Sequence, residues 1–89
     1  MTLDLPGALH QYCGGARQLR VAAQSIRALL SSLERDQPAL HRNLCDEQGA
    51  VRRHLNVFVN TDNIRDRDGL DTSLCDGDVV IVLPAVSGG

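Results

Sequence analysis

The residue types best suited to chemistry lie at the end of the chain, where Gly88 and Gly89 follow a short linker and an apolar run. Glycine has no Cβ, so it adopts almost any backbone conformation and lets the walls of another protein approach closely. A glycine pair after a structured strand would present its carboxylate on a narrow stalk. The sequence predicts a flexible working tail over residues 84–89, and the alternative is a frayed chain end.

The other side chains able to do chemistry do not gather into a site. His10, His41 and His54 lie in separate segments, without the spacing of a metal site or a catalytic triad, so we expect them to be solvated or locally hydrogen-bonded. Asp76 and Asp78 flank a glycine and suit a tight turn better than a catalytic carboxylate pair. We expect no catalytic residue, metal or bound cofactor in the chain itself.

Composition narrows the class of function further. The 89 residues form one domain with one Phe, one Tyr and no Trp, and their net charge is −2. Few aromatic rings and a slightly acidic charge argue against a nucleic-acid partner. Cys13, Cys45 and Cys75 are too widely spaced for a zinc site or a disulfide framework, and we expect small, partly buried thiols. Without a signal peptide or a membrane-length apolar run, we expect a cytoplasmic protein with no membrane partner.

All nine basic side chains are arginine, so the chain has no lysine. A GC-rich genome accounts for this bias, because it favours arginine codons. The chemical consequence holds either way: only the α-amino group of Met1 could accept an acyl group. An activated tail could not join to a lysine of another copy to form chains.

The elements that must hold the tail begin with a predicted hairpin and a helix. Residues 2–5 and 17–21 alternate polar and apolar side chains, as half-buried strands do, and predict an antiparallel hairpin with a loose connection. Ser25 is the expected N-cap of a helix. One apolar stripe of that helix is formed by Ile26, Leu29, Leu30 and Leu33. Pro38 ends this helix or opens a shorter turn.

Two later strands complete the prediction. Residues 55–60 alternate, residues 61–63 have turn chemistry, and residues 79–83 are apolar on both faces, which indicates a central strand that runs parallel to the first. The sequence predicts an α+β domain over residues 1–83, with a mixed sheet of four to five strands and one main helix packed on one face. Phe58 lies opposite the apolar face of its strand, so it is a candidate partner-binding residue; ordinary packing under a loop is the alternative.

The last part of the chain resembles a known family. Residues 76–89 place an Asp-Gly-Asp turn, an apolar strand, Pro84, a short linker and Gly-Gly in the order found at the end of ubiquitin-like sulfur carriers of the ThiS/MoaD type. The order of elements is similar to the β-grasp of that family. Leu5-Pro6, Gly14-Gly15 and residues 83–89 resemble the carriers that feed sulfur to cysteine biosynthesis. The small subunit of molybdopterin synthase is the alternative, although it often has Pro-Pro where this chain has Pro-Ala.

The resemblance implies a function and a set of partners. An E1-like adenylating enzyme would use ATP and Mg²⁺ to activate Gly89, which a sulfur donor would convert to a thiocarboxylate. The implied partners are that enzyme, a sulfur-accepting synthase and, in the cysteine branch, a metal-dependent peptidase. The carrier itself would not be an enzyme.

The tail residues then have separate expected roles. Gly88 supplies steric clearance, Val86 and Ser87 make strand-like contacts in a partner's groove, and Pro84 limits backbone freedom where the tail leaves the sheet. Two other functions stay open: a protein modifier that forms isopeptides with lysines, and a binding module that uses the sheet alone.

Overall fold

The computed structural model describes residues 1–85, so Val86, Ser87, Gly88 and Gly89 lie outside the described residues. The described strands are β1 (Thr2–Asp4), β2 (Gln18–Arg20), β3 (Leu55–Val59), β4 (Asp62–Asn63) and β5 (Val79–Pro84). The helices are α1 (Ile26–Asp36) and α2 (Pro38–Leu44), with short 3-10 helices η1 (Gly7–Cys13), η2 (Ile64–Asp66) and η3 (Gly69–Asp71).

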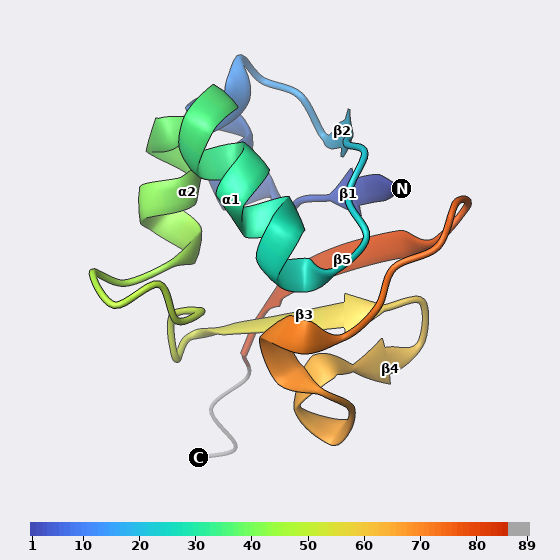
Figure 1. Ribbon diagram of the computed structural model, residues 1–89. Coiled ribbons are helices and arrows are strands. Elements are labelled where there is room, and N and C mark those ends of the chain that lie inside the picture. Colours follow the sequence, from blue (N-terminus) through green and yellow to red (C-terminus); the bar gives the residue numbers. More distant parts are fainter. Residues whose placement is uncertain (86–89) are drawn as a thin grey trace.

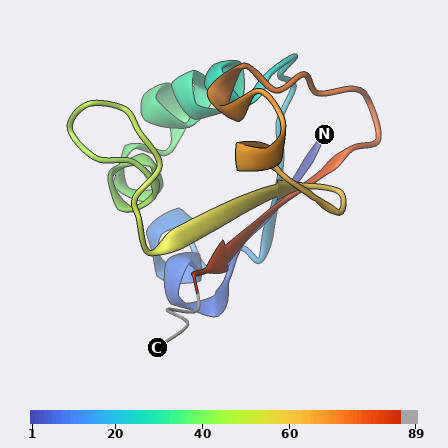
Figure 2. The ribbon, with the colours of Figure 1, turned by 90° about the horizontal axis from the view of Figure 1, so that it is seen from below.

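The five strands form one mixed sheet in the order β2-β1-β5-β3-β4. β1 pairs antiparallel with β2 and parallel with β5, which confirms the predicted hairpin and the central, parallel position of the last strand. β3 pairs antiparallel with both β5 and β4. Both α-helices lie on the same side of the sheet (Figures 1 and 2), and we call the opposite side the open face.

Local sequence explains why the helices form where they do. The Ser25 hydroxyl accepts the N–H of Ala28 at 3.1 Å, which confirms it as the N-cap of α1. The predicted apolar stripe is buried along its whole length, at Ile26, Leu29, Leu30 and Leu33. Pro38 opens a second helix, α2, in whose first turn its missing N–H costs no hydrogen bond.

The core lies between α1, α2 and the three central strands. Leu3 of β1, Val80 of β5 and Val59 of β3 are each at most 1% exposed. Because side chains alternate along a strand, Val79 and Ile81 of β5 point to the open face, where they are half-buried. β5 is thus fixed by its neighbours on both edges and by the helices on one face.

The strands β1, β2 and β3 are one or two residues shorter than predicted, and three other segments differ from the sequence-based expectation. Residues 7–13 form η1, in which Leu9 and Cys13 are buried although the run is too short to show a helical period. Residues 61–63, predicted as a turn, also contain β4, because Asn60 adopts a left-handed backbone (φ 56°) that folds the chain back onto β3. β5 includes Pro84 and is one residue longer than predicted.

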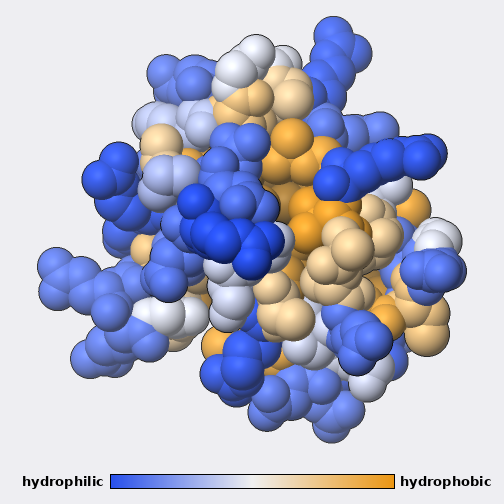
Figure 3. All heavy atoms as spheres, turned by 45° about the horizontal axis from the view of Figure 1, so that its top comes forward, coloured by the Kyte–Doolittle hydropathy of each residue, from blue (hydrophilic) through white to orange (hydrophobic). Residues whose placement is uncertain are grey.

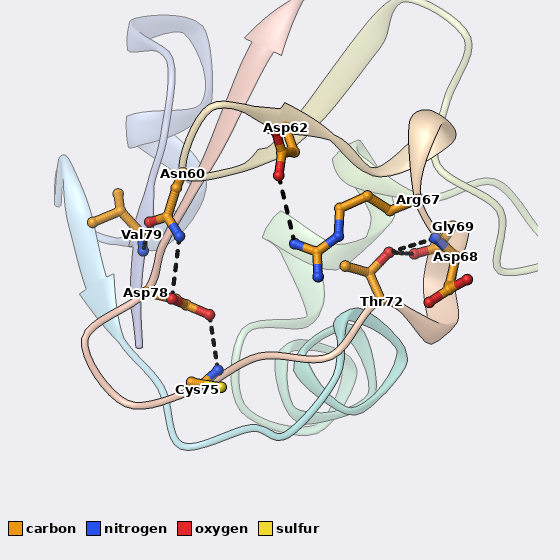
Figure 4. Close-up of polar contacts among 9 residues, drawn as sticks. All are labelled: Asn60, Asp62, Arg67, Asp68, Gly69, Thr72, Cys75, Asp78 and Val79. Atoms are coloured by element: carbon orange, nitrogen blue, oxygen red, sulfur yellow. Dashed lines mark hydrogen bonds and ion pairs between the residues drawn. The ribbon is translucent and has the colours of Figure 1, made fainter.

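The start of β5 is held by a polar cluster around Asp78 (Figure 4). The Asp78 carboxylate accepts the Cys75 N–H at 2.8 Å and the Asn60 side-chain N–H at 3.2 Å. The Asn60 side-chain oxygen accepts the Val79 N–H at 3.0 Å. The hydrogen bond from Cys75, and then that from Asn60, lower the pKa of Asp78 below its ordinary value.

The Asp78→Asn variant should lose stability in a pH-dependent way. Because folding lowers the pKa of Asp78, its contribution is present above the unfolded pKa of roughly 3.9 and is lost as the pH falls through the lower folded value. Thermal unfolding should show the largest difference from wild type at neutral pH and a shrinking difference in acid. Asp66→Asn, an exposed site outside the cluster, is the control. A difference that does not change with pH would contradict this assignment.

Candidate functional site

The segment that carries Gly88 and Gly89 starts at the end of β5. Pro84 pairs with Leu55 of β3, and the Ala85 N–H donates to the His54 carbonyl at 2.7 Å. The hydrogen-bonding groups of an antiparallel pair alternate along the strand, so the nitrogen of Pro84 points away from β3, on the side where β1 has already ended. The chain is therefore held in the sheet up to Ala85, and this fixes the point from which the tail continues.

An apolar strip on the open face leads to this point. Phe58 lies directly opposite Ile81, and Asn56 lies opposite Leu83. Leu83 is 45% exposed and is the one large apolar side chain in the exposed class among residues 1–85. Phe58 and Ile81 are half-buried. Phe58, Ile81 and Leu83 thus form an apolar strip next to the root of the tail, which is a candidate contact surface.

Charged side chains lie on both sides of the strip. Asp4 of β1 is in register with Ile81. On the other side, the Arg65 guanidinium donates to the Asn56 side-chain oxygen at 3.3 Å. A partner that covers the strip would contact an apolar centre with a carboxylate on one side and a guanidinium on the other. Charges placed in this way would attract a partner of opposite charge and fix its position on the strip.

The predicted site residues fall into two groups. Gly89, Gly88, Ser87 and Val86 lie outside the described residues, so their roles stay predictions. Pro84 lies at the root of the tail, and Phe58 lies on the open face, although it is half-buried and not fully exposed. Sequence alone singles out Phe58 on this face and misses Ile81 and Leu83. The missed signal is that β5 is apolar on both faces while helices cover only one.

The histidines are separated, and His10 is hydrogen-bonded locally. His10 Nε2 lies 2.9 Å from the Leu5 carbonyl. His41 Nδ1 lies 3.9 Å from the Glu34 carboxylate. Within residues 1–85, no three His, Cys, Asp or Glu side chains gather closely enough to hold a metal ion.

Two of the three cysteines match the expected burial. Cys13 and Cys45 are buried, whereas Cys75 is exposed in the turn before β5, so the expectation of partial burial is wrong there. Burial, and then the nearby Asp46 carboxylate, raise the pKa of Cys45 to about 11, which keeps this thiol protonated at neutral pH. None of the helices in the described part of the chain has both the length and the apolar character to cross a membrane.

The Phe58→Ala variant tests the contact surface. We expect binding of a partner protein at the strip to weaken about tenfold in Kd, because an aromatic anchor is lost. Thermal unfolding should show a smaller loss of stability than Val57→Ala, which alters the buried face of the same strand and should cost about 2 kcal/mol. If Phe58→Ala destabilises the fold more than Val57→Ala does, Phe58 belongs to the core and not to a contact surface.

Comparison with known proteins places this chain among small carriers. The sequence profile of the ThiS family matches residues 5–89. The chain is similar to the sulfur carrier protein CysO of Mycobacterium tuberculosis, with 33% identity over 91 residues that span 100% of this chain and 98% of that protein. It is also similar to small archaeal modifier protein 3 of Haloferax volcanii, with 43% identity over 65 residues, 73% of this chain and 70% of that protein.

Solved structures agree with these sequence matches. The crystal structure of Mycobacterium tuberculosis CysO superposes with a TM-score of 0.87 at 32% identity, covering 96% of this chain and 98% of that one. A chain of the crystal structure of the Amycolatopsis orientalis BexX/CysO complex gives a TM-score of 0.86 at 28% identity, covering 99% of this chain and 98% of that chain. The predicted β-grasp fold is confirmed.

Proposed function

The chain belongs to the ThiS family and is a sulfur carrier protein of the CysO type, and we propose that its working group is the carboxylate of Gly89. In this proposal a partner enzyme adenylates Gly89, and a sulfur donor converts it to a thiocarboxylate that delivers sulfur in biosynthesis. The observation that carries the proposal is the position of β5, a central strand held up to Ala85 next to an apolar strip.

The chemistry follows from the electronic state of a carboxylate. A C-terminal carboxyl group has a pKa of roughly 3.5, so it is ionised at neutral pH and is a poor electrophile. One of its oxygens attacks the α-phosphorus of ATP, and pyrophosphate leaves. A sulfur nucleophile such as hydrosulfide then attacks the acyl carbon, the bond to the adenylate oxygen breaks, and AMP leaves. The carrier ends as a thiocarboxylate, whose sulfur is a nucleophile.

The carrier's own contribution is presentation. The sheet fixes the root of the tail, the open face offers Leu83 and its neighbours for docking, and residues 86–89 would enter the active site of the partner. ATP, Mg²⁺ and proton transfer belong to that partner in this scheme. In this scheme the carrier supplies no acid, base or metal ion to the reaction.

We favour delivery of sulfur to cysteine biosynthesis over the other branches. Leu5-Pro6 and Gly14-Gly15 match the features expected of that branch, and the similarity to CysO extends over the full chain. The accepting partner would be a synthase that takes sulfur from the thiocarboxylate, and a metal-dependent peptidase would release the product if it stayed attached to the carrier. The CysO of the BexX/CysO complex is bound to another protein. This supports the proposal that the present chain also acts in complexes with other proteins.

The first half of the proposal can be tested by pyrophosphate release. With the cognate adenylating enzyme and ATP, the full chain should support release, and a variant that lacks Gly89 should not. The truncated chain should have the same unfolding temperature as wild type, because the buried core of residues 1–85 is unchanged. Equal pyrophosphate release from both chains would reject Gly89 as the activated group.

A second function, protein modification, is favoured by one observation. Small archaeal modifier protein 3 is 43% identical to this chain over the shared region. If the chain modifies proteins, tryptic digestion of cell extracts should reveal Gly-Gly remnants on lysines of other proteins, and conjugates should resist denaturation on gels. Because the chain has no lysine, such adducts would be single and would not form chains through its side chains.

A further inference from the structure

We propose that the groove between β2 and α1 is a docking site for an extended acidic segment of another protein, which adds to the sheet as a further strand next to β2. This proposal goes beyond the proposed function, because neither the tail nor the strip of Phe58, Ile81 and Leu83 takes part in it. A carrier with such a groove could stay bound to one protein while its tail reacts in another.

The groove is a hollow of about 360 Å³ beside the edge of the sheet. Its apolar lining comes from Leu19 and Val21, on and just after β2, and from Leu33 of α1. Arg20, Arg35 and Asp36 are the charged residues of its lining. Figure 3 shows apolar side chains gathered in a hollow between polar ones, on the face where α1 and β2 lie. A hollow with this lining suits a flexible peptide that carries small apolar side chains.

The backbone of β2 offers hydrogen bonds along the same groove. β2 is the last strand of the sheet, so one of its edges has no neighbouring strand among residues 1–85. The Leu5 N–H donates to the Arg17 carbonyl, and the Val21 N–H donates to the Met1 carbonyl. By the alternation of an antiparallel pair, the N–H and C=O groups of Gln18 and Arg20 point away from β1. These four groups are arranged to receive an added strand.

The charged side chains near β2 indicate which kind of peptide strand would bind beside it. Arg17 directly precedes β2 and Arg20 is its last residue, and neither forms an ion pair within residues 1–85. Arg35 forms an ion pair with Asp36 at 3.0 Å, so these two side chains together carry no net charge. The carboxylate nearest in register to β2 is that of Asp4, which lies opposite Gln18. Edge strands with such cations repel a second copy of themselves. A segment that alternates apolar and acidic residues would fill the groove and pair with the arginines.

Peptide titration tests the proposal directly. The probes are two capped heptapeptides, one alternating Glu with Val and the other alternating Lys with Val, added to isotope-labelled full-length chain and followed by amide NMR shifts. The Glu peptide should shift the amides of Gln18, Arg20 and Leu33 and bind about tenfold more tightly than the Lys peptide. The Arg20→Glu variant should reverse this preference, whereas Arg53→Glu, outside the groove, should not.

A backbone variant separates strand addition from charge attraction. Gln18→Pro removes an N–H that β1 does not use, so the hairpin should survive while binding of the Glu peptide falls about tenfold. If Gln18→Pro fails to fold, the charge reversal at Arg20 still decides the matter. Shifts confined to other residues, equal binding of both peptides, or association of the chain with itself through β2 would overturn the proposal. Activation of Gly89 is measured independently, so either proposal can fail alone.

Discussion

Replacing Gly88 with valine is expected to slow activation of the carrier by about 100-fold, which corresponds to about 2.7 kcal/mol in the barrier. The physical reason is clearance. In the proposed function, the residue before the reacting carboxyl group would pass through the narrowest part of the partner's active site, and a branched side chain there would displace the carboxylate from the attacked phosphorus. Initial rates of pyrophosphate release with the cognate adenylating enzyme measure the effect.

Ser87→Val is the matched control for this experiment, because it adds a branched side chain one residue earlier. We expect it to slow activation by less than about fivefold, since in the proposed function the partner would recognise a strand at Ser87 and would not enclose its backbone. Both variants should unfold at the wild-type temperature, because residues 1–85 hold the core. If Gly88→Val is activated at the wild-type rate, steric clearance is not the reason for the glycine.

Replacing Leu83 with glutamate should weaken activation by about 30-fold, or about 2 kcal/mol, chiefly through a higher KM. Leu83 is 45% exposed at the end of the apolar strip, adjacent to Pro84, so a carboxylate there would have to be desolvated when a partner docks. Leu83→Met should keep most of the activity, because it preserves the apolar contact. Kinetic measurement at several carrier concentrations separates KM from kcat.

The control for Leu83→Glu lies on the helix side of the molecule. Ala28 of α1 is exposed, and Ala28→Glu adds the same charge away from the strip. It should leave both activation and folding unchanged. If Ala28→Glu and Leu83→Glu reduce activation equally, net charge decides docking and the apolar strip does not.

Local signals account for the parts of the fold that sequence predicts well. The stripe from Ile26 to Leu33 and its Ser25 cap lie within nine consecutive residues, so no distant contact is needed to recognise α1. The apolar character of residues 79–83 on both faces predicts a central strand, and β5 does lie between β1 and β3. Both sequence patterns mark side chains that become buried, and the burial of apolar surface is the main driving force for folding.

The parts that sequence misses depend on contacts between distant segments. Pro84 belongs to β5 because Leu55 pairs with it across the sheet, although a proline after an apolar run predicts a strand end. β4 has only two residues and forms because Asn60 takes a left-handed conformation. The same limit applies to the site: Leu83 becomes a candidate contact residue only once the helices are known to cover the other face.

The most direct measurement is the intact mass of the chain after incubation with the cognate adenylating enzyme, ATP and sulfide. The account predicts that one oxygen is exchanged for one sulfur and that fragmentation places the sulfur on Gly89. A chain that keeps its mass under conditions that support pyrophosphate release, or that gains sulfur equally well without Gly89, would contradict it.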